Sequence, residues 1–257
     1  MTFKHIISRD NILFKQLKKL AESSRERRKL GETLLDGAHL VNTYLEVFGE
    51  PKLLVIAEGQ STAEVSHLIQ QLADIPTVMF PTLMFAELSP VASPTGIIAL
   101  VKTPVIEPVP NPKFTLMLED IQDPGNLGSM LRTAAAAGVD AVYLSEGCTE
   151  AWSPKALRGG QGAQFVLPIV ERANLLEVAS NFAGNVLATT LRGESLYDLD
   201  LSQPTAIAIG NEGSGLSDAM IKASTHQVTI PIAAGVESLN AAAAASVCLF
   251  ERVRQTI

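Results

Sequence analysis

Residues 230–253 read IPIAAGVESLNAAAAASVCLFERV: a strand-like triplet, a glycine loop and a helix almost free of bulky side chains. Ser238 is a typical N-cap residue, and Asn240 follows it in what would be the first turn, where its side chain could face a ligand. Alanine favours helix, and small side chains also let a helix approach another backbone closely. We therefore expect a closely packed last helix over 238–255, capped by Ser238.

Further strands precede this helix and alternate with other helices. Parallel strands covered on both faces are continuous apolar runs, and such runs occupy 114–119, 140–145, 185–190, 205–210 and 226–231. Helices are expected between them at 126–137, 153–163, 174–183 and 216–223. Ligands of open parallel sheets bind beyond the carboxyl ends of the strands, so the loops after Glu119, Ser145, Thr190, Gly210 and Pro231 are the candidate site.

A proline-rich segment separates this part of the chain from the first hundred residues. KTPVIEPVPNPK, residues 102–113, contains four prolines in twelve positions, which disfavours regular structure. We predict a domain over 1–102, a linker over 103–113 and a second domain over 114–257. The first part also alternates strands (33–37, 52–59, 75–80, 96–101) with helices (11–24, 38–48, a helix capped by Ser61 and running to Leu72, 82–88), which indicates an α/β sandwich.

Composition is that of an ordinary globular protein, with 47% apolar and 18% charged residues. No apolar run approaches the ~20 residues of a membrane helix, and the N-terminus lacks a secretory h-region. Cys148 and Cys248 form no CxxC and are expected to be reduced thiols. The four histidines are scattered. We therefore expect a cytoplasmic protein with no membrane segment and no metal site.

Charge is distributed unevenly along the chain. The net charge is −7, yet residues 1–31 hold nine Lys/Arg against three acidic residues, a local +6 that leaves −13 for the remainder. Such a basic segment could meet phosphates, although a solvated first helix explains it equally well. Lys155 and Arg158, one turn apart behind Ser153-Pro154, leave the same choice open. The candidate nucleic-acid contacts are Lys15, Lys18, Arg25, Arg27, Arg28, Lys155 and Arg158.

Two loops carry candidate functional side chains. In LEDIQDPGNLGSMLRTAAAAG, residues 118–138, Asn126 is a suitable N-cap and Arg132 lies on an otherwise apolar helix, which favours a functional role. In AIAIGNEGSGLS, residues 206–217, three glycines permit tight turns and close approach to a ligand. Glu212 at the tip of this loop could hold an arginine or a ligand hydroxyl, or be a solvated carboxylate. The loop lacks the GK[ST] of a phosphate loop and does not match GxGxxG, which argues against a nucleotide-dependent oxidoreductase.

The order of these weak signals is specific. Asn126-x-Gly128-x-x-x-Arg132, then Gly210-Asn211-Glu212-Gly213-x-Gly215, then Ile230-Pro231 followed by Ser238-Leu239-Asn240, resembles the three motifs of the SpoU (TrmH-like) RNA ribose methyltransferases of the SPOUT superfamily. SPKALRGGQGAQF, residues 153–165, is similar to the segment between the first two motifs, although Gly159-Gly160 replaces a bulkier pair. The resemblance covers about 114–253. LLDGAHLV and SPTGIIALV look like the small substrate-binding domain that often precedes the catalytic domain.

The resemblance implies an α/β fold in which a SPOUT domain with a parallel sheet and a deep C-terminal trefoil knot follows a small α/β/α domain. It further implies a homodimer that transfers a methyl group from S-adenosylmethionine to a ribose 2′-hydroxyl of RNA. Cofactor contacts would fall at Thr189, Thr190, Gly210, Asn211, Gly213, Ile230, Ile232 and Leu239. Catalytic residues would be Arg132, Glu212, Ser238 and Asn240, supported by Asn126.

A guanidinium stays protonated, so we expect Arg132 to bind the RNA phosphate next to the reacting hydroxyl, with Glu212 holding the guanidinium. The sequence leaves the RNA and its nucleotide open, with ribosomal RNA favoured over transfer RNA by analogy. The alternative is a catalytically silent RNA-binding relative that acts in ribosome assembly. The alanine run is then expected to pack against the knot or a partner subunit, so that Ala243→Phe would disrupt folding or dimerisation, unless the run is merely a good helix former.

Overall fold

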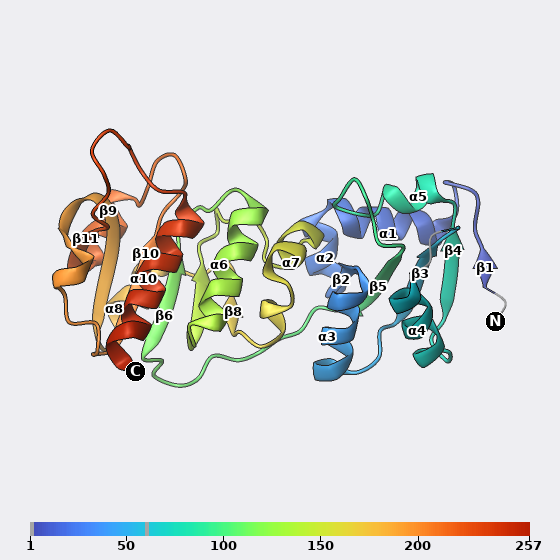
Figure 1. Cartoon of the computed structure of the whole chain (residues 1–257), viewed down its shortest axis with the longest axis horizontal. Coiled ribbons are helices and arrows are strands. Elements are labelled where there is room, and N and C mark those ends of the chain that lie inside the picture. The colour runs from blue at the N-terminus through green and yellow to red at the C-terminus, as the bar shows by residue number, and fades with distance from the viewer. Residues whose placement is uncertain (1–2, 60–61) are drawn as a thin grey trace. The chain divides into compact units, whose positions relative to one another are not determined.

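The computed structural model describes residues 3–59 and 62–257. The chain forms two compact units (Figure 1). The first comprises Met1–Pro104 and Trp152–Phe165, and the second comprises Val105–Ala151 and Val166–Ile257. This division differs from the predicted one, which separated the domains only at the proline-rich segment. Trp152–Phe165, which we predicted to lie in the second domain, packs within the first unit.

The first unit contains a mixed five-stranded sheet of order β1-β4-β3-β5-β2, in which β5 is antiparallel to β2 and β3 and the other pairs are parallel. The strands are β1 (Lys4–His5), β2 (Glu32–Asp36), β3 (Leu53–Ala57), β4 (Thr77–Phe80) and β5 (Ile97–Lys102). The helices are α1 (Ile12–Glu22), α2 (Ser24–Leu30), α3 (Ala38–Phe48), α4 (Ala63–Gln71), α5 (Thr82–Ala86) and α7 (Pro154–Gly160). Thr62 caps α4 through Val65, while Ser61, where we predicted the cap, lies outside the described residues.

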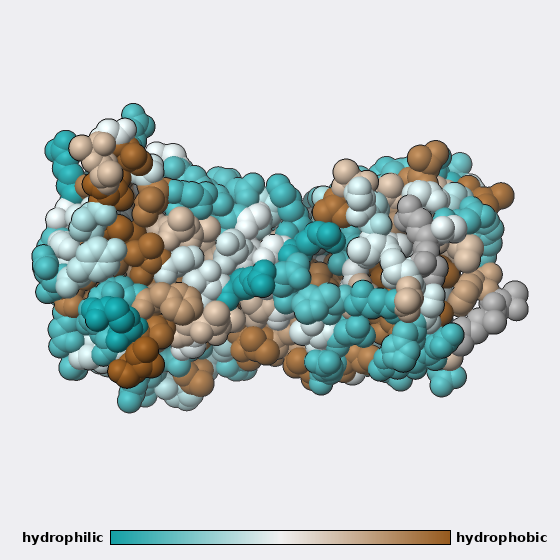
Figure 2. Space-filling view, in the orientation of Figure 1, coloured by the Kyte–Doolittle hydropathy of each residue, from teal (hydrophilic) through white to brown (hydrophobic). Residues whose placement is uncertain are grey.

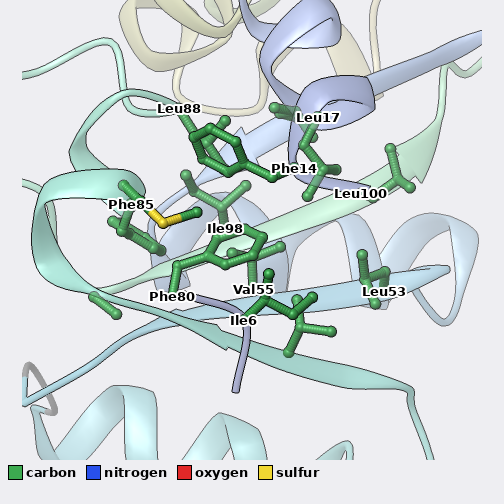
Figure 3. Packing of buried hydrophobic residues seen from close by; sticks show 14 of the residues in the cluster. Ile6, Phe14, Leu17, Leu53, Val55, Phe80, Phe85, Leu88, Ile98 and Leu100 are labelled. Carbon is green, nitrogen blue, oxygen red and sulfur yellow. The ribbon is translucent and has the colours of Figure 1, made fainter. Parts of the chain in front are cut away.

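Apolar side chains alternate between the two faces of this sheet. Val55 and Ile98 belong to a cluster with residues of α1 and α5, in which the rings of Phe14 and Phe80 meet edge to face at 5.3 Å (Figure 3). On the edge strand β2, the Thr33 hydroxyl donates to the Trp152 carbonyl at 2.7 Å, which anchors the segment that carries α7.

The second unit contains a six-stranded sheet of order β11-β9-β10-β6-β7-β8, in which every pairing is parallel. This confirms the predicted parallel α/β architecture. Its strands are β6 (Phe114–Leu118), β7 (Ala141–Leu144), β8 (Ile169–Val170), β9 (Asn185–Ser195), β10 (Thr205–Ile209) and β11 (His226–Thr229). Its α-helices are α6 (Pro124–Ala136), α8 (Leu175–Asn181), α9 (Asp218–Ala223) and α10 (Ala241–Thr256). The strand order is compatible with a C-terminal knot, and the threading itself stays a prediction.

Two of the predicted helix caps are wrong by a few residues. Asp123 caps α6 by accepting from the Asn126 amide at 2.8 Å, so Asn126 lies inside the first turn. Asn240, not Ser238, caps α10, and its Oδ1 accepts from the amides of Ala242 and Ala243. Both shifts place an asparagine side chain where it can bridge loops, as described below.

The last helix packs against α6, beside which it lies in Figure 1. Ala242 and Ala245 are buried, and the Ser246 and Thr133 hydroxyls meet at 3.2 Å. Ala243, by contrast, is exposed. The expectation that Ala243→Phe disrupts folding of the chain is therefore not supported; the close packing involves its neighbours on the opposite face of the helix.

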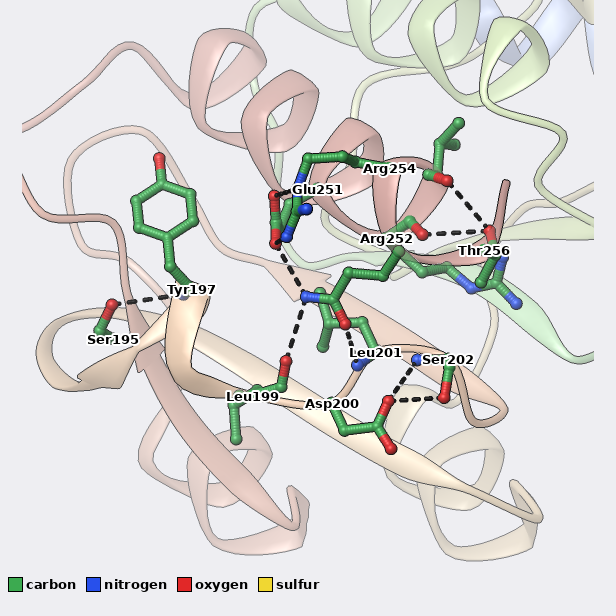
Figure 4. Close-up of polar contacts among 12 residues, drawn as sticks. Ser195, Tyr197, Leu199, Asp200, Leu201, Ser202, Glu251, Arg252, Arg254 and Thr256 are labelled. Carbon is green, nitrogen blue, oxygen red and sulfur yellow. Dashed lines mark hydrogen bonds and ion pairs between the residues drawn. The ribbon is translucent and has the colours of Figure 1, made fainter.

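The C-terminal turns of α10 are fastened to the loop that precedes β10 (Figure 4). Gln255 donates to the Leu199 carbonyl at 3.1 Å and accepts from the Leu201 amide at 2.8 Å. Glu251 accepts from Gln255 at 2.8 Å and from two nitrogens of Arg254 at 2.7 and 2.8 Å. The hydrogen bonds from Arg254, followed by that from Gln255, lower the pKa of Glu251 to about 2.

Within the described residues, no helix combines the length and apolarity needed to cross a bilayer.

Candidate functional site

An interruption in the longest strand opens a cavity at the edge of the second sheet. Gln227 of β11 lies opposite Ala188 of β9, but the next residue, Val228, lies opposite Glu194. Residues 189–193 therefore leave the ladder as a bulge. A Cβ on Gly193 would lie 2.4 Å from the Gln227 carbonyl oxygen, so only glycine allows the two strands to close again behind the bulge.

The glycine-rich loop after β10 forms the facing wall. Asn211 and Gly215 exchange backbone hydrogen bonds of 3.1 and 2.9 Å. A Cβ on Gly210 would lie 2.2 Å from the backbone of Gly215 and Leu216, so this position requires glycine. The Asn211 carboxamide shapes the loop: its Oδ1 accepts from the amides of Gly213 and Ser214, and its Nδ2 donates to the Asp120 carbonyl at 2.8 Å.

Between these walls lies a cavity of about 570 Å³ at the carboxyl ends of the strands, within the size range of small-molecule sites. All eight positions predicted to contact the cofactor line it, namely Thr189, Thr190, Gly210, Asn211, Gly213, Ile230, Ile232 and Leu239. Glu212 and Ser238 line it as well. Leu191, Arg192 and Glu237 also line it and were not predicted; the bulge in β9, which no local pattern indicates, brings the first two there.

A chain of hydrogen bonds joins the three motif loops beside this cavity. Asn240 Nδ2 donates to Asn126 Oδ1 at 3.1 Å, and Asn126 Nδ2 donates to Glu212 Oε1 at 3.1 Å. Glu212 also accepts from the backbone amides of Gln122 and Asp123, each at 3.2 Å. Asn126 thus connects the second motif to the third.

The environment of Glu212 keeps it ionised. Partial burial acts to raise the pKa of this carboxyl, but the hydrogen bonds from Asn126 and from the Gln122 and Asp123 amides outweigh it and hold the pKa below its ordinary value. An acid with a lowered pKa is a poor general base near neutrality, so Glu212 serves as a fixed acceptor that orders the loops.

Arg132 lies exposed on α6 and does not contact Glu212, its expected partner. Among the described residues its guanidinium has no hydrogen bond and no ion pair, and the three bonds to Glu212 come from other groups. The predicted pairing of Glu212 with Arg132 is therefore wrong in this structure, and the guanidinium is available to an external anion.

The third motif is presented on an open loop. Every residue from 231 to 240 is exposed, including the apolar Ile232, Val236 and Leu239. Figure 2 shows apolar residues on this loop, which Figure 1 draws in orange to red above the second sheet, ahead of α10. Ser238 lies on this loop and lines the cavity.

The predicted nucleic-acid contacts differ in their exposure to solvent. Arg27 is only 5% exposed and donates to the carbonyls of Leu20 and Ala21, so it terminates α1 and is unavailable to RNA. Lys18 pairs with Glu87 at 2.7 Å. Lys15, Arg25, Arg28 and Lys155 are exposed.

Arg158 faces a buried carboxyl instead of open solvent. Its guanidinium lies 3.8 Å from Asp36, whose other oxygen accepts from the Ser89 hydroxyl. Burial raises the pKa of Asp36, while Ser89 and Arg158 act to lower it. Arg158 thus joins α7 to β2 inside the first unit.

Among the described residues, no group of three His, Cys, Asp or Glu side chains could hold a metal ion.

Known RNA methyltransferases are similar to this chain over nearly its whole length. A 23S rRNA (guanosine(2553)-2′-O)-methyltransferase of Bacillus subtilis is 33% identical, over 96% of this chain and 98% of its own. A 23S rRNA (uridine(2479)-2′-O)-methyltransferase of Streptomyces viridochromogenes is 30% identical, over 99% and 93%. The crystal structure of the SpoU methyltransferase AviRb from Streptomyces viridochromogenes in complex with AdoMet superimposes with a TM-score of 0.85 at 27% identity, covering 95% of this chain and 98% of that one.

Family models account for both parts of the chain. The MRM3-like substrate binding domain matches residues 11–99, which lie in the first unit. The SpoU rRNA Methylase family matches residues 113–250, more than half of the chain, and the protein belongs to this family.

Proposed function

We propose that this protein transfers a methyl group from S-adenosylmethionine to a ribose 2′-hydroxyl of ribosomal RNA. The relatives aligned over nearly the whole chain act on 23S rRNA, and a structural neighbour holds AdoMet. The observation that carries the proposal for the site is the hydrogen-bonded chain from Asn240 through Asn126 to Glu212, which joins the three motifs at one edge of the cavity.

The residues of the cavity suit this cofactor. The backbone of the loop after Gly210 approaches the space closely, and Ile230, Ile232 and Leu239 supply apolar surface for a flat base. Bound there, S-adenosylmethionine would supply an electrophilic methyl group on a sulfonium. The protein must then align the ribose oxygen with the methyl–sulfur bond, and positioning of this kind accounts for much of the barrier reduction in such reactions.

Arg132 is proposed to bind the RNA phosphate beside the reacting ribose, because its guanidinium is exposed and has no partner among the described residues. A guanidinium presents a rigid fork of donors that fits a phosphate, and it does not give up its proton at ordinary pH. The hydroxyl proton leaves through this phosphate or water. Glu212, held ionised as an acceptor, is a positioning residue for the loops.

Asn240 and Ser238 divide the roles of the third motif. Both polar atoms of the Asn240 side chain are used within the protein, since Oδ1 caps α10 and Nδ2 binds Asn126. Asn240 is therefore proposed to position the loop, while Ser238, exposed at the cavity, is proposed to contact the reacting ribose.

The decisive experiment is ribose-methylation mapping of total RNA from cells with and without the protein. Loss of one 2′-O-methyl signal in rRNA is expected when the protein is absent, and an unchanged map would contradict the proposal.

Calorimetry with S-adenosylmethionine separates the enzyme from a silent RNA-binding relative, which would show no binding. Arg132→Lys should lower turnover at saturating RNA at least tenfold, and near-normal turnover would rule out a specific guanidinium role.

A homodimer in the cytoplasm completes the proposal. Ala243 and Phe250 leave an apolar stripe of α10 exposed, with Phe250 at 47% exposure, and a second copy of the chain would cover it. The two cysteines are free thiols, as a reducing compartment maintains. Light scattering should give twice the chain mass.

A further inference from the structure

A groove lies between α1 and α2 of the first unit, with no residue in common with the cofactor cavity. Its volume is about 390 Å³, which is within the range of small-ligand sites. It is lined by Ile12, Lys15, Gln16, Lys19, Glu26 and Leu30. The methyl-transfer site leaves this groove without a role.

The groove contains two exposed cations of the basic segment. Lys15 and Lys19 are one turn apart on α1, and both are exposed. The ammonium group of Lys19 has no hydrogen bond or ion pair among the described residues. Lys15 meets Asp10 at 2.8 Å, but the Asp10 side chain is 92% exposed, and so solvated a pair does not keep Lys15 from a phosphate.

Two large aliphatic side chains are left in water beside these cations. Ile12 on α1 is 84% exposed and Leu30 on α2 is 42% exposed. Gln16 and Glu26 add an amide and a carboxylate to the same lining. The groove thus combines apolar surface, hydrogen-bonding groups and cations, as recognition of an unstacked nucleotide requires: the base packs by its face, is read at its edge, and its phosphates meet lysines.

We propose that this groove binds an unpaired nucleotide of the RNA substrate, with its base between Ile12 and Leu30 and its flanking phosphates on Lys15 and Lys19. Paired RNA keeps its base faces inside the stack and cannot enter in this way. The Glu26 carboxylate accepts hydrogen bonds only, so it would bind a donor on the edge of the base, such as an amino group or a ring N–H. This proposal rests on the proposed function, because the RNA bound in the groove is the one whose ribose the protein methylates.

The test measures the affinity of the full-length protein for a fluorescein-labelled RNA hairpin with an unpaired loop, by fluorescence anisotropy over a series of salt concentrations. Ile12→Ala/Leu30→Ala should weaken binding about tenfold by removing the contacts to the base, and should leave the salt slope unchanged because no charge is lost. Lys19→Ala should reduce the slope of log K against log salt by about 0.7, the value for one phosphate contact on a single strand.

Matched controls lie in the same unit outside the groove. Leu83 is 76% exposed and Lys4 is exposed, so Leu83→Ala and Lys4→Ala remove an aliphatic side chain and a charge without touching the lining. Both should bind RNA as the wild type does. The proposal is overturned if the groove variants bind within twofold of the wild type, or if the controls lose as much. A change in oligomeric mass with unchanged RNA affinity would also overturn it, in favour of self-association.

Two measurements distinguish a failure of the groove proposal from a failure of the proposed function. They are cofactor affinity by calorimetry with S-adenosylmethionine, and the KM and kcat of methyl transfer to RNA. Groove variants should bind the cofactor normally, because no lining residue is shared, and should raise KM for RNA more than they lower kcat. If the wild type methylates RNA and the groove variants share its KM, the groove proposal fails alone. If neither the wild type nor the variants bind S-adenosylmethionine but the groove variants still lose RNA affinity, the groove is an RNA-binding site and the proposed function fails.

Discussion

Asn126→Asp tests the hydrogen-bonded chain that joins the three motifs. The substitution keeps the size of the side chain but replaces the Nδ2 donor, 3.1 Å from Glu212 Oε1, by a carboxylate oxygen. The bond to Glu212 becomes a contact between two acceptors. Asn240 can still donate to the remaining oxygen, so the perturbation is confined to one end of the chain.

The magnitude follows from two contributions. A hydrogen bond to a charged acceptor contributes about 1.5–3 kcal/mol, and two exposed like charges about 4 Å apart repel by roughly 1 kcal/mol in water. Half of such a sum, roughly 1–2 kcal/mol, would suffice to lower kcat/KM by about 10- to 30-fold if the loops must be ordered in the transition state. Cofactor affinity should fall as well, because Glu212 lines the cavity.

Methyl transfer to rRNA is the assay, and Asn174→Asp is the control. Asn174 caps α8 by accepting from the Glu177 amide, and aspartate caps a helix equally well, so this variant should behave as the wild type. The defect of Asn126→Asp should shrink as pH falls, because each carboxylate raises the pKa of the other and a protonated one can donate again. Activity within threefold of the control at pH 8 would refute a positioning role for this chain.

Three further outcomes are expected. Gly210→Ala should lower S-adenosylmethionine affinity about tenfold or more in calorimetry, because its methyl group would lie 2.2 Å from backbone of the same loop, and an unchanged affinity would contradict this reasoning. Glu251→Gln should lower Tm at pH 7, because the folded-state pKa of Glu251, about 2, lies below its ordinary value of 4.5. The carboxylate therefore stabilises the fold above pH 4.5 and loses this effect as the pH falls toward 2. The Tm values of variant and wild type should converge there. Ala245→Phe should cost about 1–3 kcal/mol in denaturant unfolding, because Ala245 is fully buried against the rest of its own chain, and an unchanged stability would contradict the packing described.

Local patterns were sufficient for five of the six strands of the second unit, because a strand buried on both faces is apolar throughout. They missed β8, whose two residues are too few to form a pattern, and the extension of β9 to Ser195. Helix starts were less well determined. Asp123, Asn126, Ser238 and Asn240 are all good caps, and propensity does not choose among them. Pro124 could have decided the first case, since proline favours the first helical position and points to the residue before it as the cap.

Side-chain availability was the weakest inference from sequence. Arg27 and Arg28 are adjacent and equally basic, yet one terminates α1 from a buried position and the other is exposed. The difference arises from helix phase and the turn between α1 and α2. Arg158 similarly meets Asp36, a residue far away in the chain, so no local signal distinguishes it from a surface cation.

The sequence by itself determined the alternation of the longer strands and helices, the glycines that let loops turn tightly, and the three motifs that indicate the family, but it missed β1, α2 and β8. Only the tertiary structure decided that Glu212 binds Asn126 rather than Arg132, that residues 189–193 leave the sheet to line the cavity, and that residues 152–165 pack in the first unit. The physical reason is distance along the chain. Asn126 and Glu212 are 86 residues apart, and contacts of that separation depend on how the sheet is assembled rather than on local propensity.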